Sequence, residues 1–337
     1  MKAFKNDSIG KEPAVLSRDT VEFRSMRLLY LGPEDMVDHV RGELFQDWTV
    51  HLALDTETAE RYLPECDAVL DAYMRVGFGS ELLEKASVLK LIVTATTGAD
   101  HIDKTVLDKR GIPLLTLRGQ REFLKNITPA AEHSWLLLMA CARGLRAAVG
   151  GVLEGEWNRN KFPGTMLRGR TIGIVGCGRI GQWMARYATA FGMSCVGFDP
   201  YLEEWPDHIR KADLEETLET ADFVTIHVPL MDETRNLIGG EQLDRMKPGS
   251  VLINTSRGEI VDEAALLKAL EEGRLSAAGL DVLSGEPDIH EHPLFQYACS
   301  HTNLVMTPHI GGYSPDALRY VLSFCCKRIL DFFGEPE

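Results

Sequence analysis

Short apolar runs alternate with amphipathic stretches along most of the chain, and this alternation predicts parallel strands separated by helices. A first series of apolar runs lies at 26–32 (MRLLYLG), 48–54, 67–73, 89–96 and 113–117. Between them, helical patterns lie at about 33–45, 57–62, 80–85 and 104–109. Strands that alternate with helices of this length form a parallel sheet covered on both faces. The first series therefore predicts one open α/β unit.

A second series of the same kind occupies the C-terminal half of the chain. Its apolar runs lie at 171–175, 194–198, 221–230, 249–256, 275–283 and 303–310. Helices are predicted at 262–273, where a glycine ends the pattern, and at 314–333, where the pattern is amphipathic. The predicted fold class is α/β, with two doubly wound parallel-sheet domains.

The segment between the two series is strongly apolar. Residues 127–149 predict one long helix, which Pro129 begins and the pair Gly150 and Gly151 ends. A helix of this character must be buried, either between domains or against another subunit. Residues 152–170, which follow, are predicted to form a loop with aromatic side chains of the exposed kind.

Composition narrows the function classes. A chain of 337 residues favours about two domains. Its formal net charge of −14 argues against nucleic acid and anionic membranes as partners, although a locally basic pocket is compatible with an anionic substrate. Seven cysteines without a C-x-x-C pair favour reduced thiols. No run is long and apolar enough to span a membrane, and residues 1–25 form a polar arm without the features of a signal peptide. We therefore predict a cytoplasmic protein, and no metal site.

The run TIGIV (171–175) leads into Gly176, Gly178 and Gly181, at the spacing G-x-G-x-x-G, and then into a helix and a strand that ends at Asp199. Gly176 permits the tight turn, Gly178 lets a pyrophosphate approach the backbone, and Gly181 lets the helix pack close to the sheet. Asp199 has the offset of an acid that binds a ribose 2′-hydroxyl and would repel a 2′-phosphate. The stretch predicts an NAD site; a glycine turn without a ligand is the alternative.

Three charged residues follow strands of the second series. Arg257 follows LINTS, Glu286 lies in SGEP after LDV, and His309 ends VMTPHI. The carboxyl ends of parallel strands are where open α/β sheets bind ligands. An arginine can bind a carboxylate and polarise the adjacent carbonyl, a histidine can exchange a proton, and a glutamate bonded to it fixes its tautomer. Each residue alone could be structural, but the set beside NADH predicts reduction of a 2-oxo acid to a 2-hydroxy acid.

At these residues the chain resembles the D-isomer-specific 2-hydroxyacid dehydrogenases, the family of phosphoglycerate dehydrogenase and glyoxylate/hydroxypyruvate reductase. The resemblance extends from about residue 67 to residue 320. The matching runs are TTGADHID (96–103), AAEHSWLLLMA (130–140), LRGRTIGIVGCGRIG (167–181), HVPLMDETRNLIG (227–239), INTSRGEIVDEAAL (253–266), AAGLDVLSGEP (277–287), HPLF (292–295) and TPHIGG (307–312).

The resemblance implies a role for each site residue. It implies a catalytic triad of Arg257, Glu286 and His309, and a contact from Asp281 to the nicotinamide carboxamide. It implies that the substrate carboxylate is bound near Thr97 and Gly98 and by the loop of Arg75, Val76 and Gly77. The implied cofactor contacts are Gly176, Gly178, Arg179, Ile180, Gly181, Asp199, His227, Pro229, Thr234, Thr255 and Asp281.

The resemblance also implies the domain organisation. A Rossmann NAD-binding domain would span 127–310, and a discontinuous, flavodoxin-like substrate domain would combine 26–126 with 311–337. The hinges would lie near 126–128 and 310–312. The segment 127–168 resembles the dimer interface of the family, which implies a homodimer.

The hinge segment 118–133 departs from the common family version, which is rich in glycine and serine. It places Arg118, Arg121 and Lys125 near the cleft. A solvated basic stretch is one interpretation, and a site for an extra anionic group on the substrate, such as a phosphate, is the other. Two further functions compete with the dehydrogenase hypothesis: an NAD-sensing, corepressor-like binding scaffold, and the oxidation of formate or phosphite on a related fold.

Overall fold

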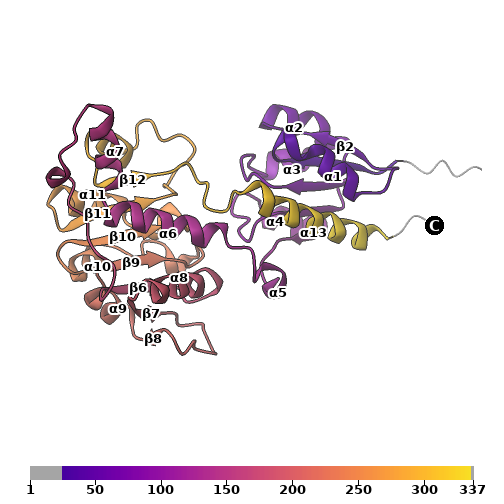
Figure 1. Cartoon of the computed structure of the whole chain (residues 1–337). Helices are drawn as coiled ribbons and strands as arrows, with labels where there is room; N and C mark the ends of the chain where they lie inside the picture. The colour runs from indigo at the N-terminus through magenta and orange to yellow at the C-terminus, as the bar shows by residue number, and fades with distance from the viewer. Residues whose placement is uncertain (1–24, 335–337) are drawn as a thin grey trace, which may run out of the picture.

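The computed structural model of the chain describes residues 25–334, so the predicted arm lies outside the described residues except for Ser25. Figure 1 shows two α/β units joined by two chain segments. We name them the five-stranded unit and the seven-stranded unit after their sheets, in which all pairs of named strands are parallel. The predicted class, two parallel-sheet α/β units, is confirmed.

The five-stranded unit has the strand order β2-β1-β3-β4-β5, which is that of flavodoxin-like doubly wound sheets. Along β1, Leu28 and Tyr30 pack in the core on one face of the sheet, and Leu29 and Leu31 pack on the other. Burial on both faces explains why the strand is a continuous apolar run. The strands are β1 (Arg27–Leu31), β2 (Thr49–Leu52), β3 (Ala68–Asp71), β4 (Leu91–Thr94) and β5 (Leu114–Leu115).

The last helix of the chain, α13 (Pro315–Phe333), completes the five-stranded unit. Its Leu322 and Cys326 lie in the same core cluster as Leu28 and Tyr30. Figure 1 shows that the chain leaves the seven-stranded unit and that α13 lies along the five-stranded unit. The C-terminal end of the chain therefore covers one face of the N-terminal sheet. The other helices of this unit are α1 (Val37–Glu43), α2 (Thr56–Tyr62), α3 (Ser80–Lys85) and α4 (Lys104–Arg110).

The seven-stranded unit has the order β12-β11-β10-β9-β6-β7-β8, which is the Rossmann order with one added strand. The order reverses between β6 and β9, where such sheets bind ligands. The strands are β6 (Thr171–Val175), β7 (Ser194–Phe198), β8 (Arg210–Lys211), β9 (Phe223–Ile226), β10 (Ser250–Asn254), β11 (Leu275–Leu280) and β12 (Leu304–Met306). The helices are α6 (Pro129–Ala142), α7 (Leu145–Leu153), α8 (Arg179–Ala190), α9 (Leu214–Thr220), α10 (Gly240–Arg245), α11 (Glu263–Glu271) and α12 (Pro293–Ser300).

The prediction of one helix over 127–149 is wrong. The segment forms two helices, α6 and α7, which meet at an angle of 65°. Gly144 lies between them, and its left-handed φ of 55° interrupts the regular helix. Gly150 and Gly151 do not end a helix, because both lie inside α7. A Cβ on Gly151 would lie 2.4 Å from the ring of Phe162, so this glycine serves packing.

The segment 152–170 is not a loop throughout, because α7 continues to Leu153 and a 3-10 turn covers Arg159–Lys161. Among the residues that the structure describes, no single helix is long and apolar enough to span a membrane. The bent pair α6 and α7 has that length and apolar character only when the two helices are taken together.

Two linkers connect the units. The first linker (residues 125–128) follows the short helix α5 (Arg121–Leu124), and the second linker (residues 310–314) leads from β12 to α13. Helix α8 contacts the first linker: the guanidinium of Arg179 donates a hydrogen bond to the carbonyl of Ile127, and the indole of Trp183 donates to the carbonyl of Lys125 at 3.2 Å. Burial lowers the pKa of Arg179. The glycine turn and the first linker are therefore joined through one helix.

Candidate active site

The glycine turn after β6 forms a cradle of exposed backbone. Gly176 has a φ of 94°, and a Cβ there would lie 2.7 Å from the backbone of His227. A Cβ on Gly181 would lie 2.2 Å from the carbonyl oxygen of Gly176, so only glycine permits this approach of α8 to the strand. A Cβ on Gly178, in contrast, would meet nothing within 4 Å. Open space therefore lies above the N-terminus of α8, as a pyrophosphate requires.

Asp199 lies at the end of β7, beside this turn. Its carboxylate accepts hydrogen bonds from the backbone N–H groups of Cys177 and Tyr201, both at 3.0 Å. Cys177 itself is buried, and burial together with Asp199 raises the pKa of its thiol to about 12. The carboxylate is thus oriented by backbone donors next to the phosphate cradle. This geometry fits an acid that binds the ribose of NAD.

His227 lies at the end of β9, against Gly176. Its Nε2 lies 2.8 Å from the hydroxyl of Thr225, and burial lowers the pKa of His227 to about 3. The imidazole therefore stays neutral at physiological pH. Its Nδ1 is buried and has no hydrogen-bond partner among the described residues.

The other predicted cofactor residues line the same edge of the sheet. Thr234 donates a hydrogen bond to the carbonyl of Pro229 at 2.7 Å, which shapes the loop after β9. The hydroxyl of Thr255, after β10, lies 2.7 Å from that of Ser134 in α6. Ile180 is half-buried at the start of α8. These residues gather at the carboxyl ends of β6, β7, β9 and β10, whereas the Arg179 side chain reaches away to the first linker.

Asp281, after β11, is fully buried in a network of donors. Its carboxylate accepts from the Thr307 hydroxyl at 2.6 Å and from the backbone N–H groups of Ile310 and Gly311 at 2.9 and 2.7 Å. His133 Nε2 lies 3.3 Å from the same carboxylate. Burial alone would raise the pKa of Asp281, but these hydrogen bonds outweigh it and lower the pKa. Asp281 therefore ties the start of the second linker to the sheet.

The three predicted catalytic residues follow three neighbouring strands, β10, β11 and β12. His309 Nδ1 lies 2.5 Å from Oε1 of Glu286, so these two side chains form a hydrogen-bonded pair. His309 has a left-handed φ of 54°, which is unusual for a residue with a side chain. Its backbone N–H donates to the carbonyl of Asp281 at 2.9 Å. The Asp281 network thus fixes the backbone that presents His309.

Arg257 lies across the cleft from the five-stranded unit. Its Nη1 donates to the carbonyl of Ser256 at 2.7 Å, and its Nε donates to the carboxylate of Asp100 at 3.3 Å. Its Nη2 lies so near Gly98 that a Cβ on that glycine would be 2.3 Å away. Arg257 therefore faces the loop between β4 and α4.

The loop of Glu286 packs against the backbone that follows Arg257. A Cβ on Gly258 would lie 2.1 Å from the backbone nitrogen of Ser284, so this close contact requires glycine. The Ser284 N–H also donates to Glu263 at 2.9 Å, and His292 Nε2 lies 3.1 Å from the same carboxylate. Glu263 and His292 were not predicted as site residues. His292 lies in the HPLF run (292–295), and this match to the family was the indication that the sequence offered.

The predicted substrate residues belong to two loops of the five-stranded unit. Thr97 and Gly98 follow β4, and Gly98 contacts Arg257. Arg75 and Gly77 are exposed after β3, and the Arg75 guanidinium stacks 4.4 Å from the ring centroid of Tyr73. The Val76 side chain lies in the hydrophobic core instead, so only the backbone of this residue could contact a substrate.

The sequence did not predict the pair that joins these two loops. His101 Nε2 lies 2.6 Å from the carboxylate of Asp71, which is fully buried at the end of β3. The same carboxylate accepts the backbone N–H groups of Tyr73 and Met74 at 3.0 and 3.1 Å. Phe78 is bridged to Ile102. The available signals were an acid at the end of a buried strand and the place of His101 in the TTGADHID run.

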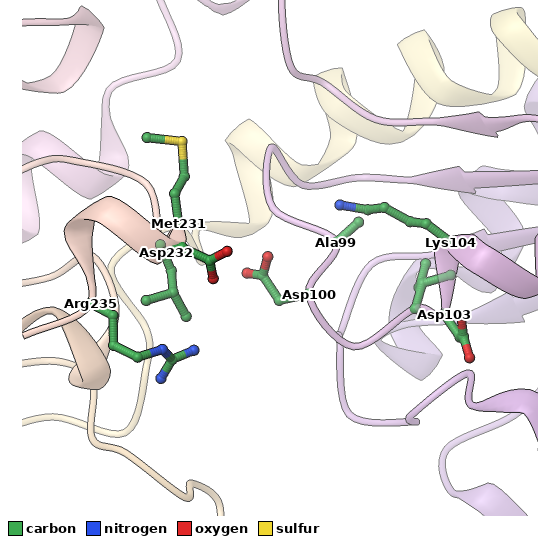
Figure 2. A pocket seen from close by; sticks show the side chains of 9 residues that line it. Ala99, Asp100, Asp103, Lys104, Met231, Asp232 and Arg235 are labelled. Atoms are coloured by element: carbon green, nitrogen blue, oxygen red, sulfur yellow. The ribbon is translucent and has the colours of Figure 1, made fainter.

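A cavity of about 370 Å³ lies between the units. Figure 2 shows the side chains that line it. The carboxylates of Asp100 and Asp232 point toward each other across it from opposite sides. Ala99, Ile102, Asp103 and Lys104 also line it from one unit, and Leu230, Met231 and Arg235 from the other. Within residues 25–334, no cluster of three or more His, Cys, Asp or Glu side chains is suited to bind a metal.

Comparison with known proteins matches both units. The model of the NAD binding domain of D-isomer specific 2-hydroxyacid dehydrogenases matches residues 135–311, and the model of their catalytic domain matches residues 28–199. A hydroxypyruvate reductase of Thermotoga maritima is 35% identical over 83% of this chain and 89% of its own length. A D-3-phosphoglycerate dehydrogenase of Methanocaldococcus jannaschii is 37% identical over 74% of this chain.

The chain spans about half the length of the D-3-phosphoglycerate dehydrogenases that it matches. Among solved structures, a D-lactate dehydrogenase from Aquifex aeolicus, complexed with NAD and lactic acid, superposes with a TM-score of 0.78. It is 27% identical, and the match covers 91% of this chain and 95% of that one.

Proposed function

Because this chain belongs to the D-isomer specific 2-hydroxyacid dehydrogenase family, we propose that it is an NAD-dependent enzyme that interconverts a 2-oxo acid and a D-2-hydroxy acid. The observation that carries the proposal is the bonded pair of His309 and Glu286 beside the strand that presents Arg257. This set supplies a proton donor and a guanidinium for an acid at the edge of the NAD-binding sheet.

The cradle of Gly176, Gly178 and Gly181 would bind the pyrophosphate of NAD, and Asp199 would accept the ribose hydroxyls. Thr255, Asp281 and the neutral His227 lie further along the same sheet edge and would contact the nicotinamide half. When bound, reduced NAD supplies the hydride for the carbonyl carbon of the substrate. Because a carboxylate at Asp199 would repel a 2′-phosphate, the site favours NAD over NADP.

Arg257 would bind the substrate carboxylate through its guanidinium and polarise the adjacent carbonyl. The backbone at Thr97 and Gly98 would supply further donors to this carboxylate. His309 would donate a proton to the carbonyl oxygen as the alcohol forms, and accept it in the reverse reaction. The carboxylate of Glu286 would orient the imidazole through their hydrogen bond, as in other acid–base pairs of histidine and carboxylate.

We also propose the domain boundaries 26–126 with 311–337 for the substrate domain and 127–310 for the NAD-binding domain. The second boundary coincides with the start of the second linker, and α13 packs with the five-stranded unit. A homodimer through residues 127–168 belongs to the same proposal, supported by exposed apolar side chains there: Leu136, Leu145, Val149, Val152, Leu153, Trp157 and Met166. The seven cysteines include no C-x-x-C pair, which supports the proposed cytoplasmic location.

The substrate proposal can be refined by the basic residues near the first linker. Arg118, Arg121 and Lys125 are exposed, and none of them forms an ion pair within residues 25–334. Three unpaired cations on and around α5 support a substrate with a second anionic group, such as a phosphate. Under this refinement, phosphohydroxypyruvate is reduced with a higher kcat/KM than hydroxypyruvate. Equal values for the two acids would contradict it.

The experiment that tests the proposed reaction is NADH oxidation with a panel of 2-oxo acids: glyoxylate, hydroxypyruvate, phosphohydroxypyruvate and 2-oxoglutarate. We expect turnover of at least one, and its loss in His309→Ala. No turnover with any of them would contradict the dehydrogenase proposal. NAD-dependent binding of a protein partner without turnover would support the corepressor-like scaffold, which the dehydrogenases and reductases among the relatives do not favour.

A further inference from the structure

One ion pair crosses the cleft, and it involves the catalytic arginine. Among the ion pairs described for residues 25–334, the pair of Arg257 and Asp100 is the one that joins the two units. The side chain of Arg257 is 24% exposed and that of Asp100 is 46% exposed, so the pair is only partly screened by water. Asp100 belongs to the TTGADHID run but was not predicted to have a role.

Two acceptors hold the guanidinium of Arg257, one on each side. Nε donates to Asp100 and Nη1 donates to the Ser256 carbonyl, whereas Nη2 has no acceptor among the described residues and lies against Gly98. Asp100 thus binds the Nε–H on the same edge of the guanidinium as Nη2, and Ser256 binds Nη1 on the other side. We propose that Asp100 is a positioning residue, which turns Arg257 so that Nη2 and the backbone at Gly98 bind the same substrate carboxylate.

The physical argument rests on the shape of arginine. The side chain is long and flexible, but its guanidinium is planar, so two acceptors in that plane determine where the remaining N–H groups point. Ser256 directly precedes Arg257 in the seven-stranded unit, so its carbonyl cannot orient Arg257 relative to the five-stranded unit. Asp100 can, because it lies two residues from Gly98 in the same loop.

The loop itself has a rigid support. The neighbour of Asp100, His101, is bonded to the buried carboxylate of Asp71, whose other oxygen accepts backbone N–H groups of the Tyr73 loop. Asp100 is thus presented by a loop that is tied to the core of the five-stranded unit. The correct orientation of Arg257 therefore depends on the approach of that unit, and an open cleft would lack a correctly oriented arginine.

The inference rests on the proposed function, so the wild type must first reduce a 2-oxo acid of the panel. The kinetic constants for that acid and for NADH are then compared in Asp100→Ala, Asp100→Asn and the control Asp232→Asn. Asp232 is an exposed carboxylate of the same cavity, and it forms no ion pair or hydrogen bond with Arg257. The control therefore removes the same charge without the contact.

For Asp100→Ala we expect kcat/KM for the acid to fall roughly 10- to 100-fold, the range for loss of a hydrogen bond to a charged group. Most of the loss should be an increase in KM for the acid, with KM for NADH unchanged. Asp100→Asn, which keeps an acceptor oxygen, should lose less. Asp232→Asn should differ from the wild type by less than about twofold.

A double-mutant cycle separates positioning from a general effect on the loop. If Asp100 acts through Arg257, Asp100→Ala should have little further effect on kcat/KM in an Arg257→Lys background. Additive effects of the two substitutions would overturn the inference, and so would an Asp100→Ala enzyme with the kinetics of Asp232→Asn. In both cases the active wild type would leave the proposed function intact. A wild type inactive on every acid would instead count against the proposed function.

Discussion

The carboxylate of Asp281 lies 2.7 Å from the backbone nitrogen of Gly311, a residue of the second linker. The same residue accepts the N–H of His309 through its main-chain carbonyl, so one buried aspartate fixes both the linker and the catalytic histidine. The resemblance assigned Asp281 only a contact to the cofactor. Its hydrogen bonds give it a structural role in addition.

Asp281→Asn should therefore reduce both stability and activity. The substitution replaces an ionised acceptor of several hydrogen bonds by a neutral group with an unmatched NH2, which costs about 3 kcal/mol. Urea unfolding measures the free energy, and kcat with a turned-over acid measures the effect on His309. Asp288→Asn is the control, because Asp288 is exposed and has no side-chain partner among residues 25–334. Equal stability of the two variants would contradict the role of Asp281.

Gly98→Ala should damage catalysis without unfolding the protein. A Cβ at this position would lie 2.3 Å from Arg257 Nη2, so the arginine must move away from the carboxylate-binding loop. A displaced catalytic group costs about 100-fold in kcat/KM. Gly42→Ala is the matched control, because a Cβ there meets nothing within 4 Å. Kinetics of Gly98→Ala within twofold of this control would show that Arg257 does not work from its observed place.

His227 should make stability depend on pH. Burial lowers its pKa from 6.5 to about 3, so between these values the unfolded chain binds a proton that the folded chain does not. The free energy of unfolding therefore falls as pH falls from 6.5 toward 3. Urea titrations over this range should give a shallower pH dependence for His227→Gln than for the wild type. Parallel curves would indicate that the imidazole titrates in the folded protein.

The exposed apolar surface of α7 and the loop after it should be covered in a dimer. Leu153 is 84% exposed, and Leu153→Glu should shift the protein from dimer to monomer in size-exclusion chromatography with light scattering. Tyr320→Glu is the control, because Tyr320 is 69% exposed but lies on α13, away from this surface. A monomeric wild type would contradict the proposed interface.

The sequence predicted most of the strands, because buried strands have a local pattern. Apolar runs of buried strands identify β6 and β10 without knowledge of their neighbours, and Arg257 and His309 lie directly after such runs. The break between α6 and α7 was not predictable in this way. The segment 127–149 is apolar almost throughout, so the pattern gave no sign of the left-handed Gly144.

The contacts that orient the site were also missed, because they join residues distant in the chain. Asp100 and Arg257 are 157 positions apart, and no periodicity relates them. Asp71 and His101 are 30 positions apart, one at the end of β3 and the other in the loop between β4 and α4. Their pairing depends on how the loops leave the sheet, which spacing alone does not specify.

The central claim is that the protein transfers a hydride to the carbonyl carbon of a 2-oxo acid to give the D-alcohol. NADH that carries deuterium at both C4 positions tests it most directly, with the product examined by NMR and chiral chromatography. We predict deuterium at C2 of the D-2-hydroxy acid, and no labelled product from His309→Ala. An L product, or an alcohol without deuterium at C2, would contradict the account.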